Sequence, residues 1–156
     1  MKAPPRQDGV AAIELALIML FFMGLLPVVV LLAQALLAYT AMQKGAHDAA
    51  RYMATLPSQM MMNAAAAAQS SAFAKQMVID AMAETWPAMD ASKVHVECVY
   101  SDDVYLCGTF ASKPLQVRVK FGADMPIDFL PDLVSKWLPQ AAPIPLRANA
   151  TLRYEN

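Results

Sequence analysis

Residues 15–33 constrain this chain most, because they run for nineteen positions without a charged or strongly polar side chain. An α-helix rises about 1.5 Å per residue, so a helix of this length spans the roughly 30 Å hydrocarbon core of a bilayer. A soluble domain needs no apolar run of this length. The sequence therefore predicts one membrane-spanning helix over residues 10–38, which anchors the rest of the chain.

Length and charge limit the kind of body that the anchor can carry. The chain has 156 residues, of which 58% are hydrophobic, so after one membrane span it has room for a single domain of about 100 residues. The net charge is −1, and the charges form no long runs, which argues against a nucleic-acid partner. Lys2 and Arg6 precede the span, and the next basic residue is Lys44. This asymmetry predicts a cytoplasmic N-terminus and a body, residues 39–156, on the other side of the membrane.

Three kinds of N-terminal segment fit such a run. If the segment were a secretory signal peptide, signal peptidase could cleave after the A-x-A sequence at residues 33–35. However, the apolar run is longer than the roughly 7–15 residues of a usual signal-peptide core, and the acidic Glu14 lies at its start. A plain uncleaved anchor explains the length but leaves Glu14 without a role. An acid at the centre of a membrane helix costs roughly 2.5–3.5 kcal/mol, less near the interface, so such a group usually has a partner.

Cleavage between Gly9 and Val10 would supply that partner. Residues 1–9 would leave as a cytoplasmic leader, and Val10 would gain an α-ammonium group. Glu14 would then lie four residues along the helix, on the same face and within reach of that ammonium or of a neighbouring subunit's. The pattern favours this third alternative.

The segment RQDGVAAIELALIMLFFMG, together with Tyr39, Gln43, Ala46 and the run AARY at 49–52, resembles the TadE-like minor pilins, or pseudopilins, of tight-adherence secretion systems. Residues 147–155 are similar to the family's closing strand. The resemblance implies an anchor in the bacterial inner membrane, a periplasmic body and processing by a prepilin peptidase. It also implies a role in assembling or initiating a type IV pilus that serves adhesion, biofilm formation and surface colonisation. The implied partners are other minor pilins, the major pilin, an inner-membrane assembly platform and membrane lipid, and the resemblance also allows the subunit itself to enter the extracellular pilus.

Beyond the span we expect an α+β, pilin-like body. Apolar spacings of three and four continue the first helix to Leu56, and its other face carries Arg51, a candidate subunit contact together with Tyr52. Pro27 should kink or loosen this helix. A second helix should begin after Asn63, end at Pro87, and pack through Phe73, Met77, Val78 or Ile79, Met82 and Trp86.

Alternating residues predict a small antiparallel sheet of three or four strands behind these helices. The segments 94–100 and 104–107 should form a hairpin, and 115–121 a third strand that Gly122 ends, with Leu115, Val117, Val119 and Phe121 inward. A short helix should cover 131–138, a proline-stiffened loop should carry Pro139, Pro143 and Pro145, and a last strand should cover 146–154. Cys98 and Cys107 would form a disulfide across the hairpin, the alternative being two reduced buried thiols.

Nothing in the sequence indicates an enzyme. Its histidines are His47 and His95, the second expected on the solvent face of a strand, and none of the common catalytic or nucleotide-binding motifs is present. Residues Met60 to Met62 are better explained as packing than as a copper site. We therefore expect no cofactor and no metal. The remaining alternative is an uncleaved single-pass module whose outer domain binds a ligand or protein.

Overall fold

The computed structural model describes residues 8–86, 89–101, 103–125 and 143–156. Its longest element, α1 (Asp8–Ala54), has 47 residues and is about 70 Å long at 1.5 Å per residue. The helix begins two residues before Val10 and continues without interruption through Pro27, so no turn is melted there. It ends at Ala54 rather than at Leu56, just before Pro57.

Two further helices come next in the chain. The first is a single turn, α2 (Ser58–Met61), directly after Pro57. Helix α3 (Ala64–Met82) begins as predicted, because the side chain of Asn63 accepts hydrogen bonds from the N–H groups of Ala65 and Ala66. The prediction that it extends to Pro87 was wrong. The N–H of Ala83 turns to the carbonyl of Asp80, and this tighter bond closes the helix at Met82.

Four strands form one antiparallel sheet in the order β2-β1-β3-β4. After a short 3-10 turn, η1 (Ala91–Lys93), come β1 (Val94–Val99), β2 (Val104–Leu106), β3 (Gln116–Met125) and β4 (Ile144–Arg153). The α+β class, the hairpin and the last strand are confirmed. The helix expected over 131–138 lies outside the described residues, as does Pro139.

Two expectations about strand ends were wrong. Gly122 does not end β3, since it pairs with Arg147 and the ladder continues to Met125 opposite Ile144. Pro145 lies inside β4 rather than in a loop. Because β4 is an edge strand, a residue without an N–H is tolerated there.

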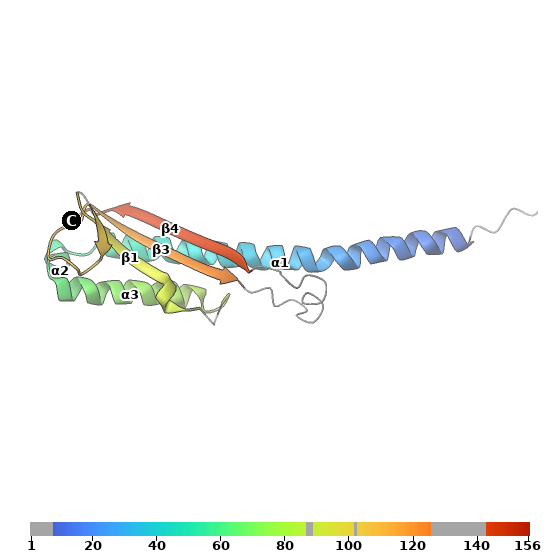
Figure 1. Cartoon of the computed structure of the whole chain (residues 1–156), viewed down its shortest axis with the longest axis horizontal. Helices are drawn as coiled ribbons and strands as arrows, with labels where there is room; N and C mark the ends of the chain where they lie inside the picture. The colour runs from blue at the N-terminus through green and yellow to red at the C-terminus, as the bar shows by residue number, and fades with distance from the viewer. Residues whose placement is uncertain (1–7, 87–88, 102, 126–142) are drawn as a thin grey trace, which may run out of the picture.

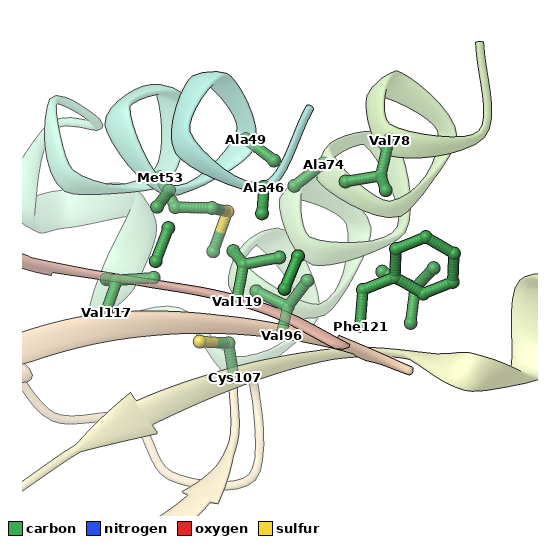
Figure 2. Close-up of a cluster of buried hydrophobic side chains, with 14 of the residues drawn as sticks. Ala46, Ala49, Met53, Ala74, Val78, Val96, Cys107, Val117, Val119 and Phe121 are labelled. Atoms are coloured by element: carbon green, nitrogen blue, oxygen red, sulfur yellow. The ribbon is translucent and has the colours of Figure 1, made fainter. Parts of the chain in front are cut away.

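The core lies between one face of the sheet and the helices α1 and α3, as Figures 1 and 2 show. Val96, Val117 and Val119 are completely or almost completely buried against Met42, Ala46, Ala49 and Met53 of α1. Leu115, expected to point inward, is 58% exposed. It precedes the strand, and the neighbouring Pro114 is buried instead.

Small residues line α3 where it meets α1. Its buried positions are Ala67, Ser70, Ala74, Val78 and Met82. The larger side chains expected there are not all inside, since Phe73 is 55% exposed and lies with its ring 5.2 Å from that of Tyr52. Gly45 explains why small residues are needed, because a Cβ added to it would lie 3.2 Å from the Cβ of Ala81. At this point the two helices lie too close for a larger side chain in place of Gly45.

The other face of the sheet is polar. His95 is exposed, as predicted, and pairs across the ladder with Lys120. The ammonium of Lys120 lies 2.8 Å from a carboxylate oxygen of Glu97. This alternation of buried and polar positions is the usual signature of a sheet covered on one side.

Candidate functional site: the projecting half of α1

The N-terminal half of α1 extends alone beyond the rest of the molecule (Figure 1). Its apolar side chains face outward, with Leu20 74% and Met23 82% exposed. Among the described residues this is the one helix long and apolar enough to cross a membrane. An apolar surface this large is unstable in water, so the structure favours a single-pass membrane anchor.

The change from exposed to buried comes near residue 38. Leu37 is 62% exposed, whereas Ala38 is 3% exposed and belongs to the core. Tyr39 lies at this boundary, and its phenol oxygen accepts a hydrogen bond from the side chain of Gln43. Tyrosine is common at the membrane–water interface, where its apolar ring contacts lipid and its hydroxyl contacts water.

The predicted processing and pairing residues lie at the other end of α1. Gly9 and Val10 are in its first turn, so the bond between them is part of the helix. Val10 is 60% exposed, and Glu14 is exposed four residues further along the same face. Within the described parts of the chain no ion pair involves Glu14. Its carboxylate is thus available to a group outside this chain or to a new N-terminus at Val10.

The two predicted contact residues at the far end of α1 differ in their surroundings. Arg51 is exposed and lies in the last turn. Its positive charge is favourable near the helix carboxyl end. Tyr52 is half-buried and packs on Phe73, so its ring helps to join α1 to α3. Arg51 therefore remains a surface residue, whereas Tyr52 has a role inside the subunit.

The predicted disulfide is present. The sulfur atoms of Cys98 and Cys107 are 2.04 Å apart, and their Cα atoms 4.9 Å. Cys98 lies in β1, and Cys107 comes directly after β2, so the bond closes the hairpin beside the core. A loop of this size is expected to stabilise the body by about 2–3 kcal/mol.

The end of the chain holds the end of α1, which sequence reasoning did not find. The hydroxyl of Tyr154 donates to the carbonyl of Leu56, and the side-chain amide of Asn156 donates to the carbonyls of Thr55 and Leu56. Both carbonyls lie directly after α1, and the N–H of Glu155 reaches the carbonyl of Ala54, one of those that the helix end leaves without partners inside the helix. Burial raises the pKa of the Tyr154 phenol. No local pattern reveals contacts between residues that lie so far apart in the chain.

Comparison with known proteins agrees with this arrangement. Residues 9–51 match the family model described as TadE-like protein. The match begins at Gly9, spans the projecting half of α1, and ends at Arg51 inside the body. No curated protein and no solved structure matches the chain.

Proposed function

We propose that this chain is a pseudopilin of a Tad pilus system, cut between Gly9 and Val10 by a prepilin peptidase, because residues 9–51 match the TadE-like family model. The mature subunit would join other minor pilins and the major pilin at an inner-membrane assembly platform. Its N-terminus would face the cytoplasm and its body the periplasm. The role is structural rather than enzymatic.

The observation that carries this proposal is the match together with the exposed apolar half of α1. The C-terminal half of α1 packs within the folded body, and its N-terminal half is exposed to lipid. This exposed half can also pack against the same helix of a neighbouring subunit. Glu14 adds a charge at the depth of the new ammonium group of that neighbour. An anchor that only held the body in the membrane would need no such acid.

Processing is tested by the N-terminal sequence of protein extracted from membranes. We expect the chain to begin at Val10. In Gly9→Val a side chain obstructs the peptidase at the bond, so the long form should accumulate and migrate more slowly on a gel. Gly24→Ala is the matched control, since a Cβ there meets nothing within 4 Å. A parent chain that begins at Met1 would instead support the uncleaved binding module.

A further inference from the structure

Three aromatic rings gather at the end of the body farthest from the projecting half of α1. Tyr100 comes directly after β1, Tyr105 lies in β2, and Phe110 lies in the loop after it. Figure 1 shows the end of β1 beside the C-terminus, at the opposite end of the molecule from the start of α1. The ring centroids are 4.7 Å apart for Tyr105 and Phe110, and 5.9 Å apart for Tyr100 and Phe110.

These rings line an open hollow of about 460 Å³, within the usual size range of small-molecule sites. Tyr105 and Phe110 are 38% and 44% exposed. Among the described residues, the lining of the hollow also includes the carboxylate of Asp103 and the ammonium group of Lys113. Exposed aromatic surface of this kind on a small domain commonly marks a binding site.

Hydrogen bonds and the disulfide hold the residues that carry the rings. The N–H of Tyr100 donates to the carbonyl of Asp103, and both the N–H and the hydroxyl of Thr109 donate to the carbonyl of Leu106. The disulfide fixes the base of the same hairpin. Pre-formed rings require little ordering when a ligand binds, which favours affinity.

The charges select the class of ligand. Ring faces and a carboxylate attract an alkylammonium group, as in aromatic cages for choline. The hydroxyl of Tyr105 donates to Asp103 and holds that carboxylate beside the rings. The ammonium nitrogen of Lys113 lies 5.6 Å from the ring centroid of Tyr154. As part of the lining it would repel a simple cation and attract an anionic group. A ligand with both an ammonium and an anionic end satisfies the whole lining.

We propose that this hollow binds a zwitterion that joins an alkylammonium group to a phosphate, with phosphocholine as the representative. The ammonium lies against Tyr100, Tyr105 and Phe110 beside Asp103, and the phosphate lies at Lys113. This site does not depend on the role in a pilus, since a processed or an unprocessed subunit presents the same hollow. Phosphocholine reaches it either as a free molecule or as a lipid headgroup.

The test uses the full chain in a polyoxyethylene detergent, which carries neither choline nor sugar. Saturation-transfer NMR should detect binding through the N-methyl protons of phosphocholine, and more weakly through those of choline. Asp103→Asn and Phe110→Leu should each lower the affinity for phosphocholine about fivefold or more. Lys113→Gln should lower affinity for phosphocholine but not for choline. Phe73→Leu, an exposed ring on α3 outside the hollow, is the matched control and should bind like the parent.

Two results would overturn the proposal: no transfer from phosphocholine, whether or not methyl glucoside shows transfer, or full affinity for phosphocholine in Asp103→Asn. Asp103→Asn changes charge at nearly constant shape, so it remains decisive if Phe110→Leu fails to fold. A vesicle assay then distinguishes the sources. If the lipid headgroup is the ligand, proteoliposomes of phosphatidylglycerol that carry the protein should cross-link phosphatidylcholine vesicles and make the suspension turbid. Free phosphocholine should then reverse this turbidity. Binding of free phosphocholine without bridging supports the site with a soluble ligand.

Discussion

Gly108 is a residue whose missing side chain the fold requires. Its φ of 94° lies in the region that favours glycine. A Cβ at this position would lie 2.7 Å from both the backbone nitrogen and the Cβ of Ala68. Gly108 comes directly after Cys107, so the disulfide and this glycine together hold the hairpin loop against the start of α3. The contact also explains why that part of α3 is built from alanine.

Gly108→Ala should destabilise the body by about 1–3 kcal/mol, because it combines a strained φ with overpacking against backbone. Thermal unfolding of the full chain in detergent measures this as a lower Tm. Gly122→Ala is the matched control, since its added Cβ would meet only the Cγ of Arg147, at 3.9 Å. Equal Tm values for the two variants would show that Gly108 does not fix the loop.

Tyr154 should make stability depend on alkaline pH. Tyrosine in an unfolded chain titrates near a pH of about 10, and burial raises the pKa of Tyr154 in the folded body. The stability that this shift contributes is fully present below about pH 10 and is lost as the pH rises through the folded pKa.

The comparison is urea unfolding of the parent and of Tyr154→Phe, at about pH 8 and about pH 11, on either side of the ordinary tyrosine pKa. The variant lacks the bond to Leu56 and should be weaker by about 1 kcal/mol at the lower pH. Between the lower and the higher pH, the free energy of unfolding should fall less for the variant than for the parent. Asp103 raises the pKa of Tyr105 as well, but that group is common to both proteins and cancels in the difference. Parallel losses would exclude Tyr154 as the alkaline group.

At the scale of elements, the contact between α1 and α3 is set by small side chains on both helices. Ala46 and Ala49 face Ala74 and Val78 across the core (Figure 2). Helices with small residues between them approach closely and leave little room for change. The larger side chain of Phe73 then lies at the edge of the contact, on Tyr52.

Ala74→Leu should therefore destabilise the body by about 1–3 kcal/mol, since the added atoms have no space between the helices. Ala72→Leu, on the exposed side of the same helix, is the matched control and should change stability by less than about 0.5 kcal/mol. Denaturant unfolding of the two variants under the same conditions measures both. A tolerated leucine at position 74 would mean that α3 can move away from α1.

Elements with a strong local pattern were predictable from the sequence. The buried stripe of α1 through Met42, Ala46 and Met53 is set by its spacing, and Asn63 marked the start of α3 by its side-chain chemistry. The stripe of α3 was harder, because hydrophobicity alone ranks Phe73 above Ala74. Only the closeness of α1 reverses that order. Likewise, the ring cluster and the bonds from the C-terminal tyrosine join segments whose proximity depends on the completed sheet.

At the scale of the whole molecule, α1 serves two environments. From Ala38 onward it contributes buried side chains to the body, whereas none of the side chains of residues 10–37 is buried. The two halves are one continuous helix, so movement of the apolar half is transmitted to the body without an intervening loop. Under the proposed function, contacts that a neighbouring subunit made with the apolar half would therefore orient the body.

The charge of Glu14 should matter for assembly and not for insertion. Glu14→Gln removes an acid from an apolar helix, which favours the membrane, so the variant should be made, inserted and trimmed. The ammonium at Val10 would then lack its partner, and each 1.4 kcal/mol or so of lost pairing lowers the docked population about tenfold. Co-purification with the partner pilins measures this loss. Glu84→Gln removes an exposed carboxylate from the body instead and should co-purify like the parent. If Glu14→Gln also co-purifies fully while the mature chain begins at Val10, the subunit is processed as proposed but is held by the apolar surface of α1 alone, and pairing between Glu14 and the new ammonium plays no part in docking.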